Sequence, residues 1–248
     1  MAISRYKLVF ILIFLQLLLF QGRLAELSAH PIRSVQIAYG RMYHGALAAG
    51  YKLRSIRGDG LSVQLDFRLS KRFTFLLEGG YFDTAVDQEE AVEQWNWPFW
   101  ERFYGNYVRA LVSRDSNYAV DLDPEQHLYM IPVQFGLRYD IPAGSFRPFI
   151  SAAAGVVFYE RNLRLNEEWT KYFPEIDHRF RYEYDNHADV RKGEVFSAML
   201  GAGTEYVLNE SFALTAGLYY RYYQVRESDR LFPLESSIGI SLGLVLYY

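Results

Sequence analysis

The carboxyl-terminal part of the chain alternates between large apolar residues and small or polar ones. Residues 238, 240, 242, 244, 246 and 248 are Ile, Ile, Leu, Leu, Leu and Tyr, whereas residues 237, 239, 241, 243 and 245 are Ser, Gly, Ser, Gly and Val. A period of two is that of a β-strand whose two faces meet different environments. Because the small residues would leave a conventional core almost empty, we expect the apolar face to lie on the outside of the protein.

The same alternation recurs along most of the chain and predicts eight strands. In the clearest segment, residues 61–69, apolar Leu, Val, Leu, Phe and Leu alternate with Ser, Gln, Asp and Arg. Each segment has about the 9–11 residues that a tilted strand needs to cross a bilayer. The predicted strands cover residues 34–42, 61–69, 73–82, 129–139, 149–159, 195–207, 212–223 and 238–248.

The segments between these strands alternate in length. Short connectors at residues 70–72, 141–147 and 209–211 alternate with long ones at residues 44–60, 83–128, 161–194 and 226–235. Short turns at one end and long loops at the other are typical of transmembrane barrels. We therefore expect an all-β fold, a transmembrane antiparallel eight-stranded up-and-down β-barrel with long external loops. The alternative, a soluble barrel with an apolar interior, would need more charge on its polar face than Gly, Ser and Ala provide.

The amino-terminal residues differ from the rest of the chain. Arg5 and Lys7 precede an apolar run over residues 8–20, which is broken only by Gln16. This run is shorter than the roughly 20 residues that span a bilayer, but it suits a secretory signal that ends at the small-residue site Leu-Ser-Ala. An uncleaved amino-terminal anchor is the alternative. The predicted boundaries are a signal peptide over residues 1–29 and one barrel domain over residues 30–248.

Composition adds three constraints. Aromatic residues make up 17% of the chain, with 21 Tyr, and tyrosine suits a boundary between water and lipid. The absence of cysteine fits a protein that passes through an oxidising compartment and excludes lipid attachment at that residue. Residues 1–29 hold three of the 26 basic and one of the 29 acidic side chains, so the remainder carries a net charge of −5. We therefore expect no nucleic-acid partner.

The last predicted strand resembles the closing strand of a known family. A polar residue, a glycine two positions on, an apolar residue and a terminal aromatic form the assembly signal of small bacterial outer-membrane barrels of the OmpA/OmpX type. In this chain the signal falls on Ser241, Gly243, Leu246 and Tyr248. Residues 132–139 and 148–155 resemble the middle of the same family. The resemblance implies a monomer in the cell outer membrane, in contact with outer-membrane lipid and lipopolysaccharide, and assembled by the barrel-assembly machinery.

Six charged residues fall on the inward face of the predicted strands. They are Asp66, Arg68, Glu78, Arg138, Glu205 and Arg221. The lumen of an eight-stranded barrel is only wide enough for side chains to fill it, and buried charges must be paired. We therefore expect an interior network of ion pairs in a filled lumen. A narrow, porin-like channel for small solutes or ions is the alternative.

The longest connector contains three of the four tryptophans within six residues. Trp95, Trp97, Phe99 and Trp100 are candidates for a surface that binds a sugar, lipid or protein, because aromatic side chains dominate binding hot spots. The alternative is that they form a small core of the loop itself. Acidic residues alternate at positions 121, 123 and 125, but the series is too short for a calcium loop. We expect no metal and no cofactor.

Catalysis is a third class, because some eight-stranded barrels modify lipid A. The candidate residues in the long connectors are His44, His127, His178, His187 and the neighbouring pair Asp115 and Ser116. His127 is followed by Leu128 and Tyr129, so the His-x-Ser pattern of a lipid A deacylase is missing. We therefore expect no enzyme, and a structural or interactive role, in membrane integrity or adhesion, carried by the external loops.

Overall fold

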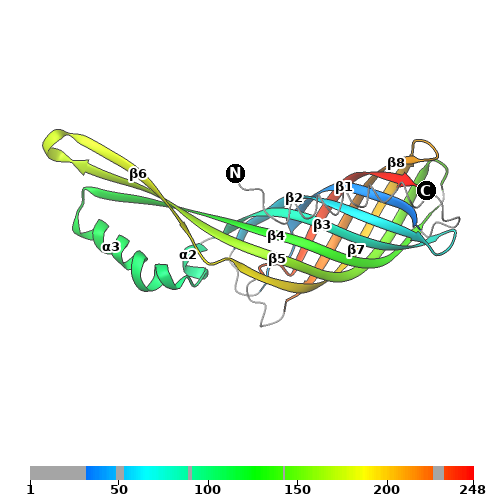
Figure 1. The fold of residues 1–248 in the computed structure, drawn as a ribbon, viewed down its shortest axis with the longest axis horizontal. Helices are drawn as coiled ribbons and strands as arrows, with labels where there is room; N and C mark the ends of the chain where they lie inside the picture. Colours follow the sequence, from blue (N-terminus) through cyan, green and yellow to red (C-terminus); the bar gives the residue numbers. More distant parts are fainter. Residues whose placement is uncertain (1–31, 49–52, 89–90, 142, 226–231) are drawn as a thin grey trace, which may run out of the picture.

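The computed structural model describes residues 32–48, 53–88, 91–141, 143–225 and 232–248. The predicted signal peptide and its cleavage site lie outside these residues. In the described part nine strands form one sheet, and eight of them close into a barrel (Figure 1). The ring consists of β1 (Ile32–His44), β2 (Leu53–Arg68), β3 (Phe73–Gln88), β4 (Tyr118–Asp140), β5 (Phe146–Phe173), β7 (Arg191–Val207), β8 (Phe212–Gln224) and β9 (Ser236–Tyr247). The ninth strand, β6 (His178–His187), lies outside the ring.

The ring closes with antiparallel neighbours on both sides of every strand. β1 pairs with β2 on one side and with β9 on the other, so that Gln36 lies opposite Gln64 and Val245. β4 pairs with β3 and β5, and the ring continues through β7 and β8. A closed ring pairs its backbone groups from strand to strand, as the interior of a bilayer requires. The predicted eight-stranded up-and-down barrel is confirmed.

Two strands are much longer than the alternation predicted. β4 has 23 residues and β5 has 28, so both continue past the predicted boundaries at residues 129 and 159. Their extra residues pair with one another as far as Tyr118 and Lys171, and β5 also pairs with β6. The prediction stopped where outward side chains cease to be apolar, but backbone pairing continues into a three-stranded extension beyond the barrel (Figure 1). The long connectors on either side are correspondingly shorter.

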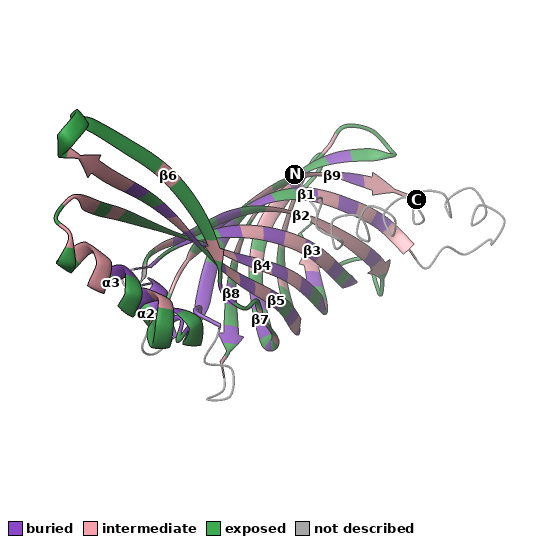
Figure 2. Ribbon diagram, turned by 60° about the vertical axis from the view of Figure 1, so that its left-hand side comes forward, coloured by how far each residue is buried: buried purple, intermediate pink, exposed green. Residues whose placement is uncertain are grey.

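The outer face of the ring is an apolar belt. It includes Leu61, Leu77, Phe135, Leu137, Ile150, Leu200, Leu218 and Leu242. Exposed aromatic residues flank the belt at one end with Tyr39, Tyr43, Tyr220 and Tyr222, and at the other with Phe73, Phe146, Tyr206 and Tyr248. Figure 2 shows buried and exposed residues alternating along the ring strands. An apolar belt between aromatic girdles is the surface of a barrel that crosses a bilayer, with the short turns on the periplasmic side.

Helical segments lie beside the extension, where the sequence predicted only a loop (Figure 1). They are α2 (Ala91–Gln94), the π-helical turn η1 (Trp100–Tyr104) and α3 (Gly105–Arg114), and a short 3-10 turn, η2 (Pro174–Ile176), ends the hairpin of β5 and β6. We call residues 91–126 and 161–187 the external module. Among the described residues, no helix is long and apolar enough to span a membrane.

Candidate functional site

The periplasmic half of the lumen holds a charged layer centred on Arg138. Its guanidinium Nη1 lies 2.5 Å from Glu205 Oε1 and 3.9 Å from Asp66 Oδ2, and its Nε donates to Asp140 Oδ1 at 2.7 Å. Its Cζ lies 3.9 Å from the centroid of the Phe149 ring. Arg138 is only 1% exposed, so one buried cation joins β2, β4, β5 and β7.

A second buried pair adjoins this layer. Arg221 Nη2 lies 3.6 Å from Glu78 Oε1 and donates to Gln134 Oε1 at 3.2 Å. Uncharged donors complete the first layer, because Ser34 Oγ and Gln64 Nε2 donate to the Asp66 carboxylate at 2.9 and 2.7 Å. Tyr247 donates its hydroxyl to Glu205 at 2.6 Å. The structure thus brings five of the six predicted charged residues into the lumen, with the partners that buried charges need.

Arg68 does not face the lumen as predicted, and Arg33 supplies the inward-facing cation in its place. Arg68 ends β2 and is exposed at the periplasmic mouth, outside the buried layer. Arg33 instead forms an ion pair with Asp140 and donates to Thr74 Oγ1 at 2.8 Å. The pairing of β1 with β2 shifts just after Ile32, and this bulge lets two consecutive residues face the lumen. Strict alternation cannot reveal a bulge, so the sequence analysis missed Arg33.

The external half of the lumen holds an apolar layer that the sequence analysis did not predict. It consists of Met42, Ile56, Phe82, Val86, Leu128, Met130, Val157, Tyr159, Val195, Tyr223, Phe232 and Leu234. Phe232 comes from the segment before β9, and its ring lies 5.0 Å from the centroids of both Tyr159 and Tyr223. Met42, Phe82 and Met130 lie on inward positions of the predicted strands, and extending the alternation into the predicted loops would have reached Ile56, Val86 and Leu128 as well. Side chains therefore fill both halves of the lumen.

The tryptophans proposed for binding are buried inside the external module. Trp95, Trp97 and Trp100 are 3%, 5% and 4% exposed, and they pack with Leu163, Leu165 and Trp169 of β5. The guanidinium carbons of Arg161 and Arg191 lie 4.8 and 5.1 Å from the Trp95 ring, which ties the helical segments to the top of the barrel. As a binding surface these three residues were therefore predicted wrongly. The alternative, that they form the core of the loop itself, agrees with the structure.

A buried carboxylate connects the helices of the module to its sheet. Glu167 is fully buried and accepts hydrogen bonds from the Tyr104 hydroxyl at 2.9 Å, from Trp169 Nε1 at 2.8 Å and from Asn186 Nδ2. Burial, followed by this hydrogen bond to Glu167, raises the pKa of Tyr104, and the nearby Tyr184 and Tyr107 raise it further. Tyr104 therefore stays protonated and remains a donor at physiological pH.

Aromatic side chains are exposed on the outside of the same module. Phe99, Phe103 and Tyr107 are 46%, 68% and 59% exposed, and Phe180 and Tyr184 of β6 are 52% and 56% exposed. The ring of the half-buried Tyr104 stacks on both Phe99 and Tyr107, with centroids 5.3 and 6.2 Å apart. We call the five exposed residues Phe99, Phe103, Tyr107, Phe180 and Tyr184 the aromatic surface. Of the predicted binding residues only Phe99 belongs to the aromatic surface. The prediction chose residues among the tryptophans and treated the segment as a loop, so it did not anticipate that one face of a helix would be exposed.

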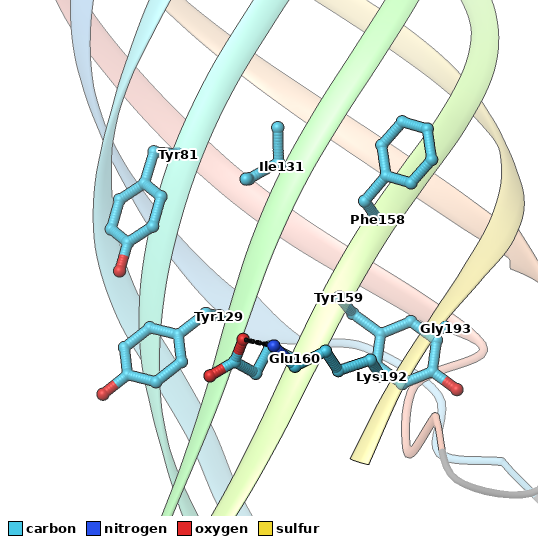
Figure 3. A pocket seen from close by; sticks show the side chains of 8 residues that line it. All are labelled: Tyr81, Tyr129, Ile131, Phe158, Tyr159, Glu160, Lys192 and Gly193. Atoms are coloured by element: carbon cyan, nitrogen blue, oxygen red, sulfur yellow. Dashed lines mark ion pairs between the residues drawn. The ribbon is translucent and has the colours of Figure 1, made fainter. Parts of the chain in front are cut away.

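A shallow pocket lies on the outer face of the barrel at the external end of the belt. Tyr81, Tyr129, Ile131 and Phe158 line a volume of about 320 Å³, closed on one side by the ion pair of Lys192 Nζ with Glu160 Oε2 at 2.9 Å (Figure 3). The rings of Tyr81 and Tyr129 stack with centroids 6.2 Å apart. The pocket combines apolar side chains with a charged rim, as expected where the belt meets the outer membrane boundary.

The residues proposed for catalysis are spread over different elements. His127 Nδ1 lies 3.1 Å from Asp83 Oδ1 on the outer face, whereas His44 Nδ1 accepts the backbone N–H of Ile56 at 3.1 Å. Asp115 follows α3 and caps a turn by accepting the N–H of Asn117 at 3.0 Å. His178 and His187 are the two ends of β6. Within the described residues, no group of three His, Cys, Asp or Glu side chains could hold a metal ion.

The predicted assembly residues all lie on or beside β9. A Cβ on Gly243 would lie 2.3 Å from the Ile37 carbonyl oxygen, so β1 and β9 can approach this closely only at a glycine. Ser241 pairs with Gly40 and Gly217, while Leu246 and Tyr248 lie at the periplasmic end. These positions fit a closing strand, and their role in assembly stays a prediction.

Comparison with known proteins yields likenesses of structure. No family model and no curated protein matches the sequence. Neisserial surface protein A is 12% identical with a TM-score of 0.45, over 87% of this chain and 96% of that one. The attachment invasion locus protein Ail of Yersinia pestis is 13% identical with a TM-score of 0.41, over 88% and 98%. The outer membrane protein OprG from Pseudomonas aeruginosa is 12% identical with a TM-score of 0.42, over 88% and 97%.

The assignment of this barrel rests on its own geometry. Eight antiparallel strands close the ring, outward side chains form the apolar belt, and inward side chains form the charged layer. Polar interiors and apolar outer faces in an even-stranded antiparallel ring are properties of the barrels that span bacterial outer membranes. The chain is a transmembrane, eight-stranded β-barrel of the bacterial outer membrane.

Proposed function

We propose that this protein is a surface-interaction protein, in which a filled barrel anchors an external module that binds partners outside the cell. The observation that carries the proposal is the aromatic surface. It places Phe103 and Tyr107, each more than half exposed, on a helical face that points away from the module core. Exposed aromatic side chains in a group are typical of binding surfaces, because each buries a large area at a small entropic cost.

The rigidity of the module supports this role. The helical segments are held by the buried tryptophans and by the hydrogen bonds to Glu167, and the sheet beneath them continues from the ring strands. A surface that is already ordered loses less conformational entropy on binding than a flexible loop does. The contacts of Trp95 with Arg161 and Arg191 connect this order to the barrel itself.

The filled lumen supports an anchoring role over transport. The charged layer and the apolar layer lie one above the other, and the side chains of both are buried. A solute would have to displace paired charges and then apolar side chains. The proposal therefore assigns no transport and no catalytic step to the barrel, and it places the interaction at the external module.

Adhesion of cells that display the protein tests the proposal. We expect wild-type cells to adhere to protein-coated or glycan-coated surfaces more than cells without the protein do, and Phe103→Ser combined with Tyr107→Ser to remove most of the difference. Arg109→Ser combined with Arg114→Ser is the matched control on α3, the helix that carries Tyr107, since it changes two exposed residues outside the aromatic surface. Equal adhesion of the wild type and the aromatic double variant would refute the proposal.

A further inference from the structure

Cations line a hollow at the periplasmic mouth of the barrel, at the opposite end from the external module. Arg33, Arg68, Lys71 and Arg147 surround a volume of about 360 Å³, and Asp140 is the acid among its described lining residues. An adjoining hollow of about 500 Å³ shares Arg33, Arg68 and Arg147. It extends to Glu210 in the turn between β7 and β8 and to Leu208 and Tyr248 on the outer face.

Four cationic side chains line the two hollows, whereas Asp140 and Glu210 are the two acidic side chains among their described lining residues. Asp140 is already engaged by Arg33 and by Arg138 Nε, which lies 2.7 Å from its carboxylate. Within the described part of the chain Arg68 and Lys71 form no ion pair. Arg147 has a contact with the Tyr247 ring, 5.7 Å from the centroid, and no ion pair there either. The mouth therefore holds three cationic side chains, Arg68, Lys71 and Arg147, that form no ion pair with a described Asp or Glu side chain.

We propose that the periplasmic mouth binds a phosphate group between Arg68, Lys71 and Arg147. Like charges held close together repel, and an anion placed between them relieves the repulsion. Phosphate suits this geometry, because guanidinium groups donate paired hydrogen bonds to its oxygens and an ammonium group adds a point charge. Arg33 is fixed by Asp140 and forms the inner wall, which separates the site from the buried charged layer.

The surroundings of the hollow favour a phosphate that is carried by a lipid. Leu208 and Tyr248 are each 53% exposed and lie where the adjoining hollow opens onto the apolar belt. A phospholipid of the inner leaflet could place its chains on this part of the belt and its headgroup in the mouth. Free phosphate in the periplasm has the same chemistry, so the experiment must separate the two sources.

Binding of phosphatidic acid to the refolded full-length protein in a non-ionic detergent tests the proposal, with native mass spectrometry as the readout. Diacylglycerol with the same chains is the matched ligand control, because it lacks only the phosphate. We expect Arg68→Gln combined with Arg147→Gln to weaken retention of phosphatidic acid about tenfold. Arg109→Gln combined with Arg114→Gln, which removes two charges from α3, should leave retention unchanged. Heat-dependent gel mobility verifies that each variant is folded.

A titration with inorganic phosphate distinguishes the sources. Displacement of phosphatidic acid by inorganic phosphate at similar concentrations would support a site for free phosphate, whereas retention of the lipid against excess phosphate would support a headgroup site. Equal retention of phosphatidic acid by the wild type and the Arg68 and Arg147 variant would overturn the proposal. Equal retention of diacylglycerol and phosphatidic acid by the wild type would overturn it as well.

Discussion

At the scale of single residues, the stability of the charged layer in the lumen depends on one arginine, Arg138, that neutralises three carboxylates. Arg138 contacts Glu205, Asp140 and Asp66, and all four side chains are buried. A buried ion pair adds little over a well-packed apolar core, but the loss of one partner leaves the others uncompensated. The stability of the periplasmic half therefore depends on Arg138 far more than on any exposed arginine.

We expect Arg138→Ala to lower the free energy of unfolding by about 3–5 kcal/mol, because it leaves buried carboxylates without their cation. Urea unfolding in detergent, followed by far-ultraviolet circular dichroism of the strands, measures the change, because all four tryptophans lie in the external module. Arg68→Ala is the control, since Arg68 is exposed and should change stability by less than about 0.5 kcal/mol. Similar losses in both variants would show that the charged layer is not what stabilises this half of the barrel.

Gly243 illustrates a residue whose role comes from the absence of a side chain. A Cβ there would lie 2.3 Å from the Ile37 carbonyl oxygen and 2.8 Å from the Ala38 Cβ, whereas a Cβ on Gly79 would meet nothing within 4 Å. We expect Gly243→Ala to destabilise the barrel by about 1–3 kcal/mol through strain between β1 and β9. Gly79→Ala should be close to neutral. Folded yield and urea midpoints of the two variants test this, and equal behaviour would contradict it.

At the scale of elements, the ring strands could be predicted because their two faces meet lipid and lumen. The alternation of Leu61, Val63 and Leu65 with polar neighbours located β2, and the parity of Arg138 placed it inside. Alternation also continues outside the barrel, with apolar Leu163, Leu165 and Trp169 in β5 and aromatic residues at every second position from 180 to 184 in β6. There the polar side chains alternate on the outward face, so a prediction that counted only strands with an apolar outward face left out the external lengths of β4 and β5 and the whole of β6. The bulge at Arg33 and the helices around Trp100 depend on tertiary contacts that no local pattern records.

The hydrogen bond between Tyr104 and Glu167 is the contact that most directly joins helix to sheet in the external module. We expect Tyr104→Phe to weaken this docking by about 1–3 kcal/mol, because Glu167 stays buried and loses one of its donors. Trypsin should then cleave faster at Arg102, Arg109 and Arg114 while the barrel stays folded. Tyr107→Phe is the control, since Tyr107 is mostly exposed. Unchanged cleavage of the Tyr104 variant would show that the tryptophan core alone holds the helices.

At the scale of the whole molecule, the two layers of the lumen lie in series between the periplasm and the outside. The charged layer around Arg138 occupies the periplasmic half, and the apolar layer with Phe232 occupies the external half. Any path for ions must cross both layers. In a filled barrel, opening one layer should therefore not create a conducting pore. In a channel with a single gate, opening that one layer should be enough to create one.

This arrangement predicts how conductance in planar bilayers responds to substitutions. The wild type should show little or no conductance. Arg138→Ala alone, and Phe232→Ala combined with Leu234→Ala, should also show little or none. Both variants are destabilised, and the double substitution in the apolar layer should lower the free energy of unfolding by at least about 3–5 kcal/mol. The three substitutions together should conduct, because they remove the central side chains of both layers. Heat-dependent gel mobility confirms that a silent variant is folded. Steady conductance of the wild type, or full conductance after opening the apolar layer alone, would show that the charged layer is a hydrated path and would favour a narrow channel over a filled anchor.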